Sequence, residues 1–186
     1  DVCSSDLSYL NNFIHYHDDE YSTIATSPDF YINTEYRFSD NYGMKLDYGY
    51  SVKTYNLENT NDILYHNISV TYSIHSPALL INYIVREPGY LLKFGAGLSY
   101  NFASFSQKTS VSKGEEIYTS NGPGFKLEAF GHSQLGTDVY MVIGLFVHAG
   151  VLGDLKNDSG KPLIQNKEIN MSFISAGLSL GLAYYF

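Results

Sequence analysis

The sequence predicts an all-β protein, an eight-stranded antiparallel up-and-down β-barrel. Apolar and polar residues alternate in eight separate segments, and this alternation is typical of strands with two different faces. The composition agrees, because 18 Tyr and 11 Phe favour strands and only 16% of residues are charged. With 186 residues, the chain has the length of one such domain.

Turn residues separate the predicted strands. Residues 39–43 form one turn, and residues 75–77 are expected to end the third strand. Glu87-Pro88-Gly89 predicts a tight turn, because Pro fixes φ and Gly accepts a positive φ. The fifth strand is the clearest, whereas Leu80 and Ile84 blur the polar face of the fourth. The eight predicted strands are 30–38, 44–53, 64–74, 79–86, 90–102, 125–130, 139–151 and 174–186.

Two long polar connections, 104–122 and 153–167, follow the fifth and seventh strands. Shorter connections follow the fourth and sixth, and such asymmetry is typical of membrane-spanning barrels. The first half of the chain fits less well, because the connection 56–62 is longer than its neighbours. No stretch reaches the roughly 18 consecutive apolar residues of a transmembrane helix. Any membrane crossing is therefore assigned to strands.

The chain divides into three parts. Residues 1–7 resemble the translation of a sequencing adapter and are expected to be non-native. Residues 8–27 are expected to form an N-terminal extension or the remnant of an upstream strand, and residues 28–186 form the predicted barrel. The single cysteine, Cys3, excludes an internal disulfide.

Charged residues within the predicted strands fall on the polar phase. The apolar phase therefore faces either lipid or the packed core of a soluble protein. In lipid, a Lys or Arg at the bilayer midplane destabilises the protein by about 2–4 kcal/mol. A lumen-facing polar phase explains its many small residues, since an eight-stranded barrel has little interior space. The charges expected to pair in the lumen are Glu35, Arg37, Lys45, Asp47, Arg86, Lys93, Lys126 and Glu128. The small residues are Gly95, Gly97, Ser99, Ser175, Gly177, Ser179, Gly181 and Ala183.

The last nine residues, Leu178 to Phe186, alternate apolar and small residues and end on Phe. This ending resembles the C-terminal signal of outer-membrane barrels. Together with Phe94-Gly95-Ala96-Gly97-Leu98-Ser99-Tyr100 and the strand count, it makes residues 30–186 similar to the small bacterial outer-membrane β-barrel proteins of the OmpX/OmpA-like type.

The resemblance implies an outer-membrane location, contact with outer-membrane lipid and no cofactor. It also implies that the barrel assembly machinery recognises the last strand, and that residues 104–122 and 153–167 face the outside, where an extracellular partner is expected to bind. The residues assigned to the assembly signal are Leu180, Leu182, Tyr184 and Phe186.

The expected role is structural or surface interaction without catalysis. A net charge of −8 argues against nucleic acid as a partner, because no basic face is available. A soluble lipocalin-like ligand-binding barrel is an alternative, because it shows the same alternation with the apolar face inward.

A lipid A-modifying enzyme, of deacylase or acyltransferase type, is the other alternative. His132 and Ser133 lie near Glu128 in sequence, but neighbours on a strand point to opposite faces, and a polar turn is the preferred interpretation. His148 is expected to pack in the lumen. A cluster of His and Asp residues near the N-terminus is a weak metal candidate, and no metal is expected. Its members are His15, His17, Asp18 and Asp19.

Overall fold

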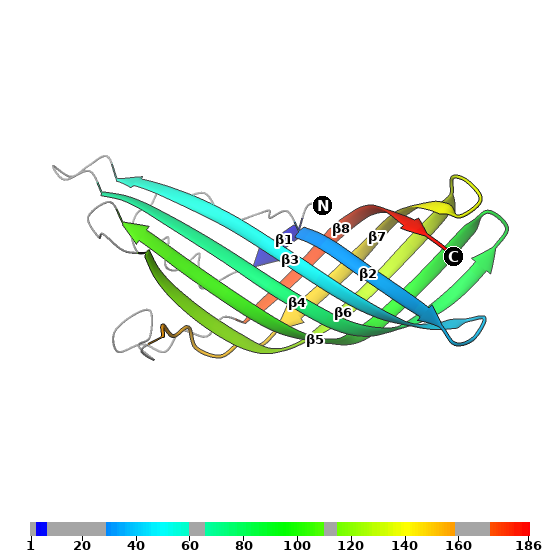
Figure 1. Ribbon diagram of the computed structural model, residues 1–186, viewed down its shortest axis with the longest axis horizontal. Coiled ribbons are helices and arrows are strands. Elements are labelled where there is room, and N and C mark those ends of the chain that lie inside the picture. The colour runs from blue at the N-terminus through cyan, green and yellow to red at the C-terminus, as the bar shows by residue number, and fades with distance from the viewer. Residues whose placement is uncertain (1–2, 7–28, 60–65, 110–114, 159–171) are drawn as a thin grey trace.

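The computed structural model describes residues 3–6, 29–59, 66–109, 115–158 and 172–186. Within these ranges the chain is all-β, and seven long antiparallel strands follow one another in an up-and-down sheet that curls into a half-barrel (Figure 1). The strands are β1 (Cys3–Asp6), β2 (Asp29–Arg37), β3 (Tyr42–Asn59), β4 (His66–Glu87), β5 (Tyr90–Thr109), β6 (Glu115–Gln134), β7 (Val139–Gly150) and β8 (Phe173–Tyr184). The predicted fold class is confirmed at this level.

The edges of the sheet are β2 on one side and β8 with the short β1 on the other. The four residues of β1 pair with residues 174–177 of β8. Among the described residues β2 pairs with β3 alone, so no backbone ladder joins β2 to β8. The eight predicted segments correspond to the seven strands β2–β8.

This difference arises because the predicted strands 64–74 and 79–86 are one strand, β4. The prediction that residues 75–77 end a strand is wrong. Proline lacks the N–H that a ladder needs, so it was read as a break. Opposite Ser76 and Pro77 the ladder to β3 continues, while the ladder to β5 skips both residues. The strand therefore accommodates Pro77 by interrupting its pairing on one side.

The continuity of β4 also corrects the face assigned to its first half. In the predicted segment 64–74, Tyr72 and Ile74 stand on the apolar phase, which predicts that they point outward, but they are buried, at 4% and 5% exposure. Leu79, on the apolar phase of the predicted segment 79–86, does point outward and is 51% exposed. Side chains alternate along one strand, and the separation from Ile74 to Leu79 is an odd number of residues, so the two point to opposite faces.

With a single β4, every short connection lies at one end of the sheet (Figure 1). Residues 38–41, 88–89 and 135–138 join strands at this end, which we call the turn end. The connections after β3, β5 and β7 leave the opposite end, which we call the loop end. The asymmetry that the sequence showed only in its second half therefore holds along the whole sheet.

The predicted long connection 104–122 is largely strand, which corrects the sequence-based boundary. β5 continues to Thr109 and β6 begins at Glu115, and the two remain paired from Lys108 and Glu115 onward. The polar residues of this region suggested a loop, but polar residues also occupy the outward face of a strand that is bathed in water.

The chain after β7 continues alongside β6 toward the loop end. Val151 N–H donates to the Pro123 carbonyl at 2.9 Å, and Gly153 N–H donates to the Asn121 carbonyl at 3.1 Å. An isolated bridge joins Lys156 to Thr119. This segment, 151–156, places Leu152 and Leu155 inside, each 1% exposed. They belong to an apolar core that includes Tyr72, Ile74, Phe105, Tyr118, Leu152, Leu155 and Phe173.

Glycine at position 97 is predicted to be required by the close approach of β4 and β5. A Cβ at Gly97 would meet the Leu79 carbonyl oxygen and the Leu80 Cα, which are backbone atoms that cannot rotate away. Gly97→Ala is expected to lower the free energy of unfolding by about 2 kcal/mol, measured by urea denaturation. At Gly131 the nearest atoms are 3.8 Å away, so Gly131→Ala is the matched control with almost no cost. Equal losses in both variants would contradict the packing argument.

Candidate functional site

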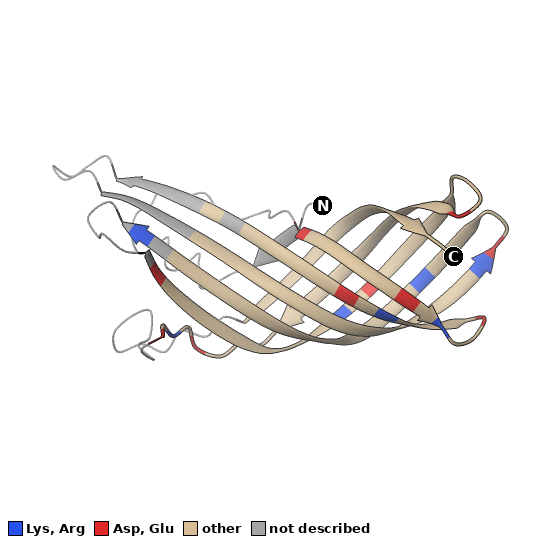
Figure 2. Ribbon diagram, viewed as in Figure 1, with Lys and Arg blue, Asp and Glu red and all other residues tan. Residues whose placement is uncertain are grey.

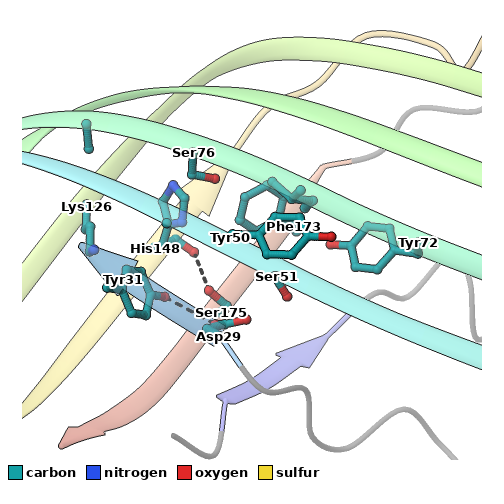
Figure 3. A pocket seen from close by; sticks show the side chains of 13 residues that line it. Asp29, Tyr31, Tyr50, Ser51, Tyr72, Ser76, Lys126, His148, Phe173 and Ser175 are labelled. Atoms are coloured by element: carbon teal, nitrogen blue, oxygen red, sulfur yellow. Dashed lines mark hydrogen bonds between the residues drawn. The ribbon is translucent and has the colours of Figure 1, made fainter. Parts of the chain in front are cut away.

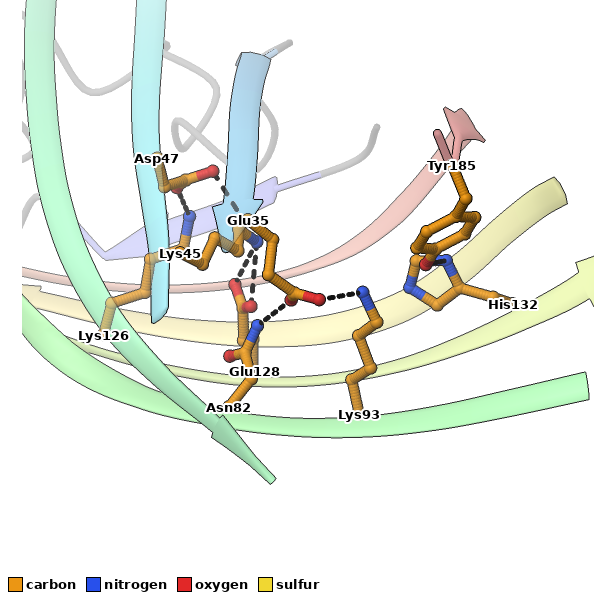
Figure 4. A network of polar contacts seen from close by, with 9 residues as sticks. All are labelled: Glu35, Lys45, Asp47, Asn82, Lys93, Lys126, Glu128, His132 and Tyr185. Atoms are coloured by element: carbon orange, nitrogen blue, oxygen red, sulfur yellow. Dashed lines mark hydrogen bonds and ion pairs between the residues drawn. The ribbon is translucent and has the colours of Figure 1, made fainter. Parts of the chain in front are cut away.

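The charged side chains of the strands gather on the concave inner face. Figure 2 shows Lys, Arg, Asp and Glu concentrated in the middle and turn-end parts of the strands, with further charges near the tips of β5 and β6. Seven of the eight charges predicted to face the lumen form two groups of ion pairs there. Figure 4 shows all of them except Arg37.

The deeper group connects β3 to β6 across the interior. Lys45 Nζ donates to both carboxylate oxygens of Glu128, at 2.8 and 2.9 Å, and lies 3.7 Å from Asp47. Lys126 Nζ donates to the other oxygen of Asp47 and sits over the Tyr31 ring, 4.2 Å from its centroid. All four charged side chains are 7% exposed or less. Buried charges of this kind are tolerated only because each one is paired.

The second group lies closer to the turn end and is centred on Glu35. Its carboxylate accepts from Lys93 Nζ at 2.7 Å and from Asn82 Nδ2 at 2.6 Å. Arg37 Nε lies 3.4 Å from the same carboxylate. The Arg37 guanidinium also stacks over the Tyr185 ring at 4.7 Å, while Lys93 Nζ lies 5.1 Å from that ring. Tyr185 follows β8, so this contact spans the two edges of the sheet.

The two groups together hold four cations and three anions, counted from the five ion pairs. Aromatic ring faces supply additional attraction to the surplus positive charge, because their quadrupoles are negative at the face. The rings that lie against these cations are those of Tyr31, Phe130, Phe146 and Tyr185.

Arg86 is the one predicted lumen charge that does not join these groups. It is exposed beside the tight turn at the end of β4, and the salt bridges among the described residues do not include it. Its phase along β4 points inward, but the strand ends at Glu87, so the side chain lies at the rim. Phase alone therefore could not separate a lumen charge from a rim charge.

The sequence analysis missed the uncharged members of the site. Asn82 is fully buried and donates to Glu35, and Tyr185 contacts both Arg37 and Lys93. Both residues stand on the polar phase of their segments, which was the available signal. Neither residue is charged or small, and the lumen prediction depends on those two kinds of residue.

A cavity of about 210 Å³ lies between the charged side chains and the inner face of β8, where Ser179, Gly181 and Ala183 line it. Polar walls of this kind suit ordered water. Small inner residues elsewhere make room for the ion pairs. A Cβ at Gly95, for example, would lie 2.7 Å from Cγ of Glu128.

The two candidate catalytic histidines point inward. His132 is buried in β6, with Nδ1 2.9 Å from the Tyr185 hydroxyl, whereas Ser133 is exposed on the other face. Both residues belong to the strand, so the prediction of a turn at this point is wrong; the turn begins after Gln134. The β6 ladder pairs His132 with Leu91 and Val142, which keeps the backbone extended.

His148 is also buried, and its Nε2 lies 2.9 Å from the Ser99 hydroxyl. Its ring meets Phe173 edge to face, with centroids 5.1 Å apart. A small cavity of about 40 Å³ adjoins it near the start of β2, where Asp29 and Ser175 also lie (Figure 3). This histidine is packed within the sheet and is not presented on its outer surface.

No group of three or more potential metal ligands occurs among the described residues. The cluster formed by His15, His17, Asp18 and Asp19 lies outside them. The described part of the chain also contains no helix long and apolar enough to cross a membrane.

The outer face of the sheet is apolar over most of its area. On β7, for example, Ile143, Leu145 and Val147 are 54%, 59% and 45% exposed. The predicted assembly-signal residues continue this face along β8 and beyond. They are Leu180, Leu182, Tyr184 and Phe186, which are 66%, 76%, 63% and 109% exposed.

Aromatic residues form two bands on this outer face. The band at the turn end contains Tyr36, Phe38, Tyr42, Tyr83, Tyr90 and Tyr184. The band toward the loop end contains Tyr48, Tyr50, Tyr100 and Phe102. Beyond the second band the outward residues become polar, as Thr71, Ser73, Ser104, Ser106 and Thr119. An aliphatic zone therefore lies between two aromatic borders.

No protein-family model matches the chain, and no curated protein matches its sequence. The function is therefore inferred from the chemistry of the two faces of the sheet.

The Lys45–Glu128 pair yields a test of the interior. Lys45→Met is expected to lower the free energy of unfolding by about 3–5 kcal/mol, because it leaves the Glu128 carboxylate buried without its cation. The double variant Lys45→Met, Glu128→Leu is expected to recover most of this loss. Arg86→Gln, at the exposed rim, serves as the control with little change. Urea denaturation measures all three, and a double variant no more stable than Lys45→Met would contradict the pairing.

Proposed function

We propose that this protein is an integral β-barrel of the bacterial outer membrane, in which eight strands close around a packed polar lumen. Its role is structural or one of surface interaction, without catalysis. The observation that carries the proposal is the apolar outer face. Soluble monomers rarely expose contiguous apolar patches beyond a few hundred Å², whereas here large apolar residues of all seven long strands, β2 to β8, point outward.

The distribution of charge supports the same conclusion. Ion pairs and small residues occupy the inner face, and aliphatic residues occupy the outer face. A soluble lipocalin-like barrel requires the opposite arrangement, with apolar side chains lining an internal cavity. The inner cavity of about 210 Å³ is lined by charged and polar groups such as Lys45, Lys93 and Glu128, so it does not suit an apolar ligand.

The height of the apolar zone matches a bilayer. On β5 the aromatic borders are Tyr90 and Tyr100, and the outward residues between them are Leu92, Phe94, Ala96 and Leu98. Ten residues of a strand tilted by about 45° rise about 25 Å. This is the height of the apolar band of outer-membrane barrels, and aromatic girdles flank that band on both sides.

Closure of the sheet is part of the proposal, because an open edge cannot remain unpaired in lipid. All the strand pairs from β2 to β8 are antiparallel, so β2 and β8 run in the same direction, and one further strand between them would be antiparallel to both, as closure by an eighth strand requires. The Arg37–Tyr185 contact already links the two edges at the turn end.

The exposure of the C-terminal residues supports the proposed assembly signal. Phe186 is fully exposed, and its ring stacks on Tyr184 with centroids 6.2 Å apart. Leu180, Leu182 and Tyr184 extend the same outward row. We propose that the barrel assembly machinery binds this edge, and that the loop end, including parts of 104–122 and 153–167, faces an extracellular partner.

The enzymatic alternative, lipid A modification, requires a histidine paired with a Ser or Glu on the lipid-facing rim. His132 and His148 instead contact Tyr185 and Ser99 inside the sheet. These contacts favour the non-catalytic role.

Substitution of one outward residue by arginine tests whether the outer face contacts lipid or water. Leu145→Arg, in the middle of the aliphatic zone, is expected to reduce the free energy of unfolding in lipid vesicles by about 2–4 kcal/mol. Thr119→Arg, beyond the loop-end aromatic band, is the matched control and is expected to change it by less than about 0.5 kcal/mol. In a soluble protein Leu145 is simply an exposed leucine, so equal and negligible effects at both positions would refute the membrane proposal.

The orientation is tested by labelling with a membrane-impermeant maleimide on intact cells. Two variants are made in a Cys3→Ser background, Lys113→Cys between β5 and β6 and Gly136→Cys between β6 and β7. We expect labelling at position 113 on intact cells and at position 136 only after permeabilisation. The reverse pattern would invert the proposed topology, and labelling of both on intact cells would contradict it.

A further inference from the structure

One row of outward residues crosses four strands at the border between the aliphatic zone and the polar loop end. The strand register places Tyr50 beside His75, His75 beside Phe102, and Phe102 beside Asn121. These four residues of β3, β4, β5 and β6 are called the boundary row. It lies in the loop-end aromatic band, where outward side chains change from apolar to polar.

Two tyrosines fix the polar members of the boundary row. The Tyr48 hydroxyl lies 2.6 Å from Nδ1 of His75, and Tyr50 packs on the same imidazole with ring centroids 4.7 Å apart. The Tyr100 hydroxyl donates to Oδ1 of Asn121 at 2.8 Å. Tyr48 lies two residues before Tyr50 on β3, and Tyr100 lies two residues before Phe102 on β5. In both cases the tyrosine hydroxyl bonds to the row member on the next strand, so the same arrangement occurs twice.

These contacts determine which atoms remain for a ligand. We assign the Tyr48 hydroxyl as the donor to Nδ1 of His75, and this tautomer carries the imidazole proton on Nε2. Because Oδ1 of Asn121 already accepts a bond, its Nδ2 hydrogens are the remaining polar group. Within the described ranges, Nε2 of His75 and Nδ2 of Asn121 have no acceptor. The row therefore presents two N–H donors, one on each side of Phe102, which is 48% exposed.

An apolar surface continues directly from these donors toward the turn end. The next apolar outward residues are Leu79 on β4, Leu98 on β5 and Phe125 on β6, which are 51%, 71% and 46% exposed. Beyond them an outer groove is lined by apolar residues that include Ile81, Ala96, Leu127 and Val147. A donor pair above an apolar track is the arrangement that an amphiphile with a polar head and acyl chains would match.

We propose that the boundary row binds a membrane phospholipid, whose phosphate accepts from His75 Nε2–H and whose glycerol ester carbonyl accepts from Asn121 Nδ2–H. The acyl chains lie over Phe102, Leu98 and the groove around Ala96. The proposal rests on the membrane location proposed above and adds a specific lipid site to it. The two donors are two strand spacings apart, about 10 Å, so one lipid spans both through its phosphate and its ester carbonyl, whereas a free phosphate ion reaches only one.

The test uses the folded protein in detergent micelles, with 15N-labelled imidazole and amide groups followed by NMR. Dihexanoyl phosphatidylcholine is titrated first, then dihexanoylglycerol, which lacks the phosphate, and then inorganic phosphate alone. We expect saturable shifts of the His75 ring and Asn121 side-chain signals with the phospholipid. We expect affinity to fall about tenfold in His75→Phe and in Asn121→Leu, since each variant loses one hydrogen bond.

Tyr83→Phe, which removes a hydroxyl from the turn-end aromatic band, is the matched control and is expected to leave the affinity unchanged. Equal responses to dihexanoylglycerol, or to phosphate alone, would overturn the phospholipid site, as would phospholipid affinity unchanged in both row variants. Failure of the site is distinguishable from failure of the membrane proposal. The His75→Phe and Asn121→Leu proteins are also tested for insertion into vesicles, which the membrane proposal requires them to retain.

Discussion

The ion pairs between β3 and β6 are the constraint on which the shape of the molecule depends. Two strands, β4 and β5, separate these partners in the sheet, so Lys45 can reach Glu128 only if the sheet curls. The inner residue of β5 under this bridge is Gly95, which leaves space for the Glu128 side chain above it. The small residue on β5 is therefore needed for the ion-paired side chains to fit inside the curled sheet. The cost of burying the charges is offset only while each keeps its partner.

The interior changes character along the strands. Ion pairs fill the part near the turn end, while an apolar core that includes Phe105, Leu152 and Phe173 fills the part near the loop end. The outer face changes in the opposite sense, from apolar in the middle to polar beyond the loop-end aromatic band. Where the strands extend beyond the aliphatic zone, their outward side chains are polar and their inward side chains are apolar. This is the arrangement found in a sheet of a water-soluble protein.

Alternation predicted the all-β fold and the phase of most strands, because a period of two follows from backbone geometry alone. The alternation gave the wrong face for residues 64–74, because these residues belong to the same strand as residues 79–86. Pro77 does not end that strand, since it keeps its pairing with β3 and lacks only the pairing with β5. The sequence alone does not reveal this register. The lumen charges were predictable from phase, but their partners were not. Lys45 and Glu128 are 83 positions apart, and only the folded sheet brings them together. Arg86 shares their phase and was misassigned because phase carries no information on depth.

The segment 151–156 has a consequence for engineering the protein as a display scaffold. Its backbone bonds to β6 and the burial of Leu152 and Leu155 make it part of the interior, although it lies in a connection between strands. A foreign epitope inserted there would have to expel two leucines from the core before it reached solvent. The two-residue turn at Pro88 and Gly89, whose glycine adopts a φ of 86°, is equally unsuitable. At the turn around Gly136 a new side chain meets no neighbour, but the proposed orientation directs this turn away from the cell exterior, so a segment grafted there would not be displayed on intact cells.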